Sequence, residues 1–131
     1  MKKRFYLLGF IFAFPFAAIS STPLDQYKQM GGISGIAETC LGETELGYAL
    51  TESLIIYLIN TPSSTEAVGQ LYNTYVNSYN KATKDFKIWI GSKQMYSETS
   101  YNCNNVEDMN SIKQFSDSLT QGLKNGNTVS D

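Results

Sequence analysis

The chain has 131 residues, with ten basic and twelve acidic side chains, two cysteines and no histidine. The missing histidine excludes Ser-His-Asp and Cys-His catalytic arrangements, histidine general bases and most catalytic zinc sites. The length fits one domain of modest size, and the sequence contains no internal repeat or linker.

The first twenty residues are typical of a secretory signal peptide. A basic start, "MKKR", precedes the apolar run "FYLLGFIFAFPFAAIS", in which Ala18 and Ser20 are small residues suited to a cleavage site. The run is interrupted by Pro15 and is too short for a good membrane span. We expect residues 1–20 to be removed, leaving residues 21–131 as a single helical domain in the periplasm without membrane contact.

Removal of this segment makes the protein more acidic. The mature chain keeps seven lysines, no arginine and twelve acidic residues, so its net charge falls to −5. A nucleic-acid-binding surface needs a basic face and benefits from arginine. We therefore expect no nucleic-acid partner.

Apolar residues recur at helical spacing in four stretches of the mature chain. This pattern predicts an all-α fold, a compact bundle of about four helices with an irregular segment or short hairpin before the last one. The four stretches are residues 24–41, 43–60, 63–82 and 106–123.

Local signals refine these helices. Gly31-Gly32 is a weak point in the first helix, and residues 54–59 are apolar nearly all round, so we expect the second helix to be the most buried. Asn105 suits the N-cap of the last helix, and residues 124–126 read as its stop.

Tyrosines form a stripe on the third predicted helix. Tyr72, Tyr75 and Tyr79 share one helical face. Such a stripe is usually at the edge of the core, with its hydroxyls reaching the surface, although a ligand-stacking platform is the alternative.

The segment between the third and fourth helices loses the helical period. Phe86, Ile88 and Ile90 alternate as in a strand, and Gly91-Ser92 is typical of a turn. A short hairpin, an irregular loop and a fraying helix end all fit this pattern.

The two cysteines, Cys40 and Cys103, lie near the end of the first helix and just before the last one. In an exported chain two cysteines most simply form a disulfide. A closed loop of about 60 residues corresponds to roughly 4 kcal/mol of stabilisation in the chain-entropy treatment. A redox pair is the alternative, but the sequence has no Cys-x-x-Cys motif.

With no histidine in the chain, carboxylates are the remaining candidates for catalysis. Glu43, Glu45 and Glu52 gather near the second helix, and Glu107 and Asp108 open the last one. Nothing in this spacing favours two acids that face each other across a cleft, as a glycosidase requires. We expect no catalytic residue, metal or cofactor, and we interpret the chain as a non-enzyme.

The best candidate for a recognition surface is the segment from residue 89 to residue 101. The helices are expected to direct their apolar stripes to the core, which leaves polar outer faces, whereas this segment combines aromatic and charged side chains. Tight interfaces commonly depend on a few such anchors. The alternative is that Trp89 covers the core and the rest is a connection, and the acidic stretch 43–52 is the next candidate surface. The predicted partner-binding residues are Trp89, Lys93, Tyr96, Glu98 and Tyr101.

The order of these features resembles the type VI secretion amidase immunity proteins. The resemblance covers nearly the whole mature chain and depends on "IAETCLGE", "ALTESLIIYLI", "STEAVGQLYNTYVNSY" and "YNCNNVEDMNSIKQFSDSL". Members have one cysteine late in the first helix and another just before the last. The run after Cys103 keeps the apolar spacing typical of the family but lacks its leucine and tyrosine.

The resemblance implies a protein that binds an injected cell-wall amidase in the periplasm and blocks its active-site cleft, with a homodimer as a possible state. Two other classes also fit a small exported helical chain: a periplasmic acid-stress chaperone and a structural accessory subunit of a secretion system. A chorismate mutase would need arginines for its dicarboxylate substrate, and the mature chain has none.

Overall fold

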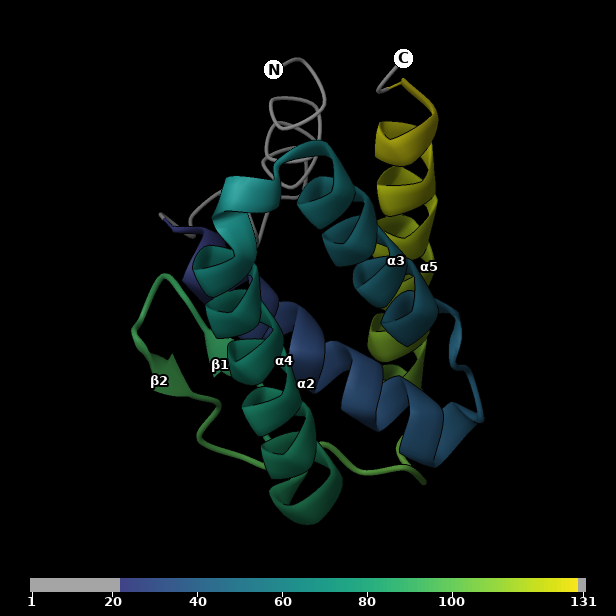
Figure 1. The fold of residues 1–131 in the computed structure, drawn as a ribbon. Helices are drawn as coiled ribbons and strands as arrows, with labels where there is room; N and C mark the ends of the chain where they lie inside the picture. Colours follow the sequence, from purple (N-terminus) through teal and green to yellow (C-terminus); the bar gives the residue numbers. More distant parts are fainter. Residues whose placement is uncertain (1–21, 130–131) are drawn as a thin grey trace.

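The computed structural model describes residues 22–129, and the predicted signal peptide lies outside them. Within this range the chain forms four α-helices and one short two-stranded sheet. The prediction of a compact all-α bundle with a short hairpin before the last helix is confirmed. In Figure 1, α3 and α5 run side by side, and α2 crosses from the α4 side of the molecule to the α3 side. The elements are α2 (Pro23–Leu41), α3 (Glu45–Asn60), the 3-10 turn η2 (Pro62–Ser64), α4 (Thr65–Asp85), β1 (Trp89–Ile90), β2 (Met95–Tyr96) and α5 (Val106–Val129).

Helix α2 lies at the centre of the core. Its start is capped by Thr22, whose hydroxyl accepts a hydrogen bond from the Asp25 amide at 3.1 Å. Every residue from 31 to 37 is buried, and the helix packs against α4, α5 and β1. The sequence prediction that the second helix is the most buried is therefore wrong, because α2 occupies the position between the other elements.

Glycines allow α2 and α4 to approach closely. A Cβ atom on Gly35 would lie 2.9 Å from the carbonyl oxygen of Tyr79, and one on Gly31 would collide with the carbonyl oxygen of Tyr75. The helix runs unbroken through this region. The predicted weak point at Gly31 is thus a helix–helix contact, where backbone meets backbone because no side chain intervenes.

The tyrosine stripe of α4 lies at the edge of this contact. The Tyr79 hydroxyl donates a hydrogen bond to the Glu38 carboxylate at 2.7 Å, and the Tyr75 hydroxyl lies 3.4 Å from the Ser34 hydroxyl. Burial, followed by the hydrogen bond to Glu38, raises the pKa of Tyr79 to about 12. Two of the three tyrosines are half-buried and 46% of Tyr72 is exposed, which fits the core-edge interpretation of the stripe.

Helix α3 has one buried face and one exposed face. Its inner residues Leu46, Leu50 and Leu54 belong to the core that α5 also covers. Its outer face is exposed, with 52% of Ile55 and 70% of Ile59 accessible to solvent. The expectation that the helices present polar outer faces is therefore wrong for α3, whose outer face carries large apolar side chains beside its glutamates.

A short antiparallel hairpin follows α4. Phe86 ends the helix in the left-handed conformation, with φ of 57°, and the chain then turns into β1. In the hairpin Trp89 pairs with Tyr96, and Ile90 pairs with Met95. Of the three alternatives that the sequence left open for this segment, the short hairpin is the one observed.

Helix α5 begins where the sequence predicts and ends later. The side chain of Asn105 accepts a hydrogen bond from the Asp108 amide at 2.9 Å, so the predicted N-cap is confirmed. The helix continues to Val129, and the predicted stop at residues 124–126 is wrong. A glycine inside a helix costs only about 1 kcal/mol relative to alanine, so Gly126 does not have to end it. Among the described residues, no helix combines the length and the apolar character needed to cross a membrane.

Candidate protein-binding site

The hairpin is fixed to the first turn of α2 by one carboxylate. The two oxygens of Asp25 accept hydrogen bonds from the indole nitrogen of Trp89, at 3.1 Å, and from the side-chain amide of Gln94, at 2.9 Å. Gln94 also donates to the carbonyl oxygen of Gly91, at 2.8 Å, within the turn of the hairpin. Asp25 therefore connects both the first strand and the turn to α2, although more than 60 residues separate it from each of them in the sequence.

Two lysines flank the aromatic pair of the hairpin. The rings of Trp89 and Tyr96 meet edge to face, with centroids 5.2 Å apart. The ammonium group of Lys28 lies 3.6 Å from the centroid of the Trp89 ring, and that of Lys81 lies 5.3 Å from the centroid of the Tyr96 ring. Lys81 also forms an ion pair with Asp85 at 2.9 Å, which raises the pKa of the lysine. These cation–π contacts place positive charge beside both strands.

The five predicted partner-binding residues have different environments. Lys93 and Glu98 are exposed, and Trp89 and Tyr96 are half-buried in the contacts described above. Tyr101 is also half-buried, its amide donates to the carbonyl oxygen of Phe86 at 2.7 Å, and burial together with the charge of Asp108 raises its pKa.

The tip of the hairpin is thus the accessible part of the predicted surface. Lys93 and Met95 are exposed there, and 42% of Met95 is accessible to solvent. Tyr96 follows on β2 and keeps part of its ring at the surface. Tyr101 packs against the core, and Trp89 attaches the segment to α2 through its hydrogen bond to Asp25.

A cavity of about 200 Å³ lies behind the hairpin. Its lining is mainly apolar and includes Ile33 of α2, Phe115 of α5, and Trp89, Ile90 and Tyr101. The hairpin therefore does not fill the space between itself and the two helices.

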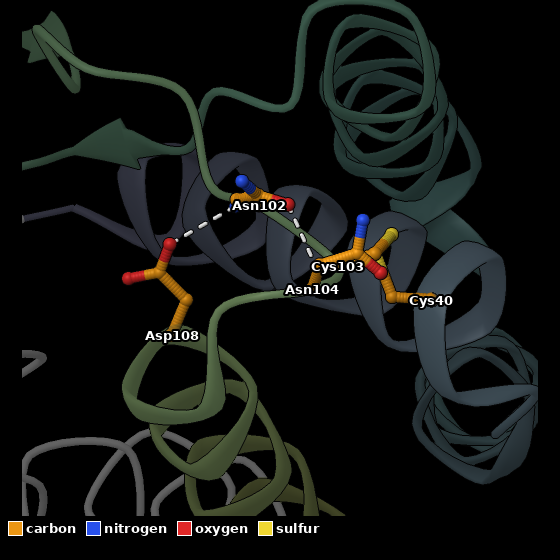
Figure 2. The surroundings of a disulfide bond; sticks show 5 residues. All are labelled: Cys40, Asn102, Cys103, Asn104 and Asp108. Carbon is orange, nitrogen blue, oxygen red and sulfur yellow. Dashed lines mark hydrogen bonds between the residues drawn. A yellow bond between two sulfur atoms is a disulfide. The ribbon is translucent and has the colours of Figure 1, made fainter.

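The disulfide that the sequence predicts is present. Cys40 at the end of α2 is bonded to Cys103, and their Cα atoms lie 5.1 Å apart. The backbone amide of Asn102 donates a hydrogen bond to the Asp108 carboxylate at 3.0 Å, and the backbone amide of Asn104 donates to the side-chain oxygen of Asn102 at 2.8 Å. Figure 2 shows both bonds beside the disulfide. The bond and these contacts fix the chain between the hairpin and α5, so the hairpin is attached near both of its ends.

The five carboxylates that the sequence analysis considered for catalysis do not gather at one site, and Glu45 and Glu52 line only a shallow hollow beside α3. Glu43 forms an ion pair with Lys113 at 2.7 Å, whereas Glu45 and Glu52 are exposed on α3. Asp108 is engaged at the start of α5. No group of His, Cys, Asp or Glu side chains within the described part of the chain is arranged to hold a metal ion.

Sequence reasoning did not identify three residues that position the site. Asp25, Lys28 and Lys81 lie on helices α2 and α4 rather than in the segment that was singled out. A polar side chain in the first turn of a helix is ordinarily interpreted as a contribution to the helix dipole. No local signal in the sequence connects Asp25 with an indole on a distant strand.

Comparison of the chain with protein-family models, with curated proteins and with solved structures finds no match. The functional interpretation therefore depends on the hairpin and its surroundings.

Proposed function

We propose that the protein is a periplasmic immunity protein that binds a secreted cell-wall amidase and blocks its active-site cleft. The observation that carries this proposal is the rigid attachment of the hairpin. Asp25 holds one end of the segment through Trp89 and Gln94, and the Cys40–Cys103 bond holds the other. A loop that is ordered before binding loses less conformational entropy in the complex than a free loop would.

The chemistry of the hairpin tip is suited to insertion into a protein cleft. Lys93 supplies an exposed positive charge, and Met95 supplies a flexible apolar side chain that adapts to irregular surfaces. Tyr96 adds an aromatic ring that is already oriented by Trp89 and therefore loses little rotamer freedom on binding. These neighbours form a small mixed surface of the kind that anchors protein complexes.

The test is inhibition of a peptidoglycan amidase encoded beside the gene for this protein. The protein is purified from the periplasm after expression of the full chain, so that export and disulfide formation follow their normal course. Its addition in equimolar amount should abolish hydrolysis of purified cell-wall sacculi by the amidase. Hydrolysis that continues unchanged in the presence of excess protein, without complex formation in calorimetry, would contradict the proposal.

Hairpin variants locate the contact within such a complex. Lys93→Glu should weaken binding by at least about 1–2 kcal/mol, the size expected for an interface anchor, and should leave the melting temperature nearly unchanged because the side chain is exposed. Tyr96→Ala should weaken binding similarly, although it also removes the aromatic contact with Trp89. Tyr72→Ala is the matched control, since Tyr72 is a partly exposed tyrosine on α4.

A further inference from the structure

The outer face of α3, which consists of Glu45, Tyr48, Glu52, Ile55 and Ile59, forms one continuous exposed stripe. These residues recur at intervals of three or four, so they follow one side of the helix over about four turns, roughly 20 Å. All five are exposed, and the three large ones keep 72%, 52% and 70% of their surface accessible in chain order. The opposite side of the helix packs into the core of the described chain.

The composition of this stripe is unusual for a solvent-facing helix surface. A helix at the surface of a soluble protein normally directs polar side chains outward, and a helix that is apolar all round is normally covered on every side. Here Leu50 and Leu54 already provide the buried side of α3. Contiguous exposed apolar side chains with charged neighbours are typical of a surface that another molecule covers.

The charges of the stripe define what that molecule carries. Glu45 and Glu52 lie among the apolar side chains, and neither forms an ion pair with another described residue. Lys124 is the one basic residue that lines the shallow hollow beside them. The stripe is therefore apolar with a net negative charge, and it complements a surface with apolar and positively charged side chains.

A second copy of the chain complements the stripe poorly. A symmetric contact through this face would bring together Glu45 and Glu52 of both copies, four carboxylates, against only the two Lys124 ammonium groups. The excess of like charge at such an interface opposes association. An anionic membrane surface would be repelled for the same reason. The charge distribution thus favours a cationic protein segment over both.

We propose that the outer face of α3 is a docking site for a cationic amphipathic segment of a partner protein. Tyr48, Ile55 and Ile59 bury apolar side chains of that segment, and Glu45 and Glu52 pair with its lysines or arginines. The site is separate from the hairpin and stands independently of the proposed amidase inhibition.

The test uses a synthetic probe of defined chemistry and the protein purified from the periplasm. The probe is a fluorescent helical peptide of about 14 residues, four turns, with leucines on one face and lysines on the other. A second peptide with glutamate in place of lysine tests the role of charge. Binding is measured by fluorescence anisotropy at low and high ionic strength, and sedimentation shows whether the protein alone is a monomer.

The lysine peptide should bind, more weakly at high ionic strength, and the glutamate peptide should not. Ile55→Asp and the pair Glu45→Lys with Glu52→Lys should each weaken binding at least about tenfold, because each removes one of the two kinds of complementary contact. Matched controls lie at the start of α5, where Val106 is 72% exposed and Glu107 is exposed. Val106→Asp makes the same apolar-to-charged change away from α3, and Glu107→Lys makes there the change that each member of the glutamate pair undergoes. Both should leave binding within about twofold of the unmodified protein.

Four results would overturn the proposal. They are no binding of the lysine peptide, equal binding of the glutamate peptide, equal weakening by the α5 controls, and a dimer that Ile55→Asp converts to monomers. The last result would assign the outer face of α3 to a second copy of the chain. Circular dichroism of each variant shows that a loss of binding does not come from loss of the fold.

Discussion

The hairpin and the outer face of α3 both bring apolar side chains to the surface, but their surroundings differ. In the hairpin, Trp89 donates to a carboxylate of α2, lies against a lysine and packs edge to face on Tyr96. On α3, Ile55 and Ile59 are more than half exposed. The aromatic residues that stand out in the sequence are thus largely engaged within the fold, whereas an inconspicuous apolar helix keeps an uncovered face.

This difference shows that residue type alone does not identify a recognition surface. An aromatic ring whose polar atom is satisfied and whose faces are covered contributes mainly to the stability of the fold. An aliphatic side chain that stays exposed beside another one contributes little to that stability and is available to a partner. Four experiments on stability would sharpen or break this distinction.

The largest effect is expected from removal of the bridge that links the two regions, since Cys40 leads into α3 and Cys103 follows the hairpin. Replacement of both cysteines by serine should lower the free energy of unfolding by roughly 4 kcal/mol, because the unfolded chain regains the entropy of a long open loop. Urea unfolding followed by circular dichroism and by the fluorescence of the single tryptophan measures this loss. An unchanged midpoint would contradict the structural role of the bond.

The next effect separates the two faces of α3. Leu50→Ala should cost about 3 kcal/mol, because Leu50 is fully buried and its truncation leaves a cavity in the core. Ile55→Ala, one and a half turns along the same helix, should change the free energy of unfolding by less than about 0.5 kcal/mol. Chemical denaturation of both variants provides the comparison. A large cost at Ile55 would mean that the outer face is needed for the fold and would weaken its interpretation as a docking site.

A smaller effect is expected where the hairpin meets α2. Asp25→Ala removes the acceptor of two hydrogen bonds and should cost about 1–2 kcal/mol. Because Trp89 is the only tryptophan, its emission should shift to longer wavelength as the indole becomes more hydrated.

The matched control for this change is Asp117→Ala, which removes an exposed aspartate whose ion pair with Lys113 lies within α5. That variant should alter stability by less than about 0.5 kcal/mol, as exposed ion pairs contribute little. Native emission from Trp89 in the Asp25 variant would show that the hairpin is held by other contacts.

The last effect appears only in alkaline solution. The pKa of Tyr79 is about 12 in the folded chain and near its ordinary value of 10 in the unfolded chain, so the unfolded state loses its proton first as pH rises. The contribution of Tyr79 to stability is therefore complete below pH ~10 and is lost between pH ~10 and ~12. Tyr79→Phe should reduce this alkaline loss, whereas Tyr48→Phe on the exposed face of α3 should not. Denaturation midpoints across this range test the difference, and equal loss in both variants would contradict it.

Several features were determined by the sequence itself, because they depend on neighbours along the chain. Helical periodicity located α2 to α5, since the contacts that define a helix are three and four residues apart. Asn105 identified the start of the last helix, because a side-chain cap acts on the amides of the next turn. Two cysteines in a chain that the sequence predicts to be exported were sufficient to predict the Cys40–Cys103 bond.

Other features were decided only by the tertiary structure, because they depend on residues that are distant along the chain. The attachment of Trp89 to Asp25 joins positions 64 residues apart, and no local pattern encodes that pairing. The extension of α5 past Gly126 and the close contact at Gly31 also departed from the local signals. The two faces of α3 show the physical reason most clearly: periodicity indicates which side chains are apolar, but the surrounding helices determine which of them water reaches.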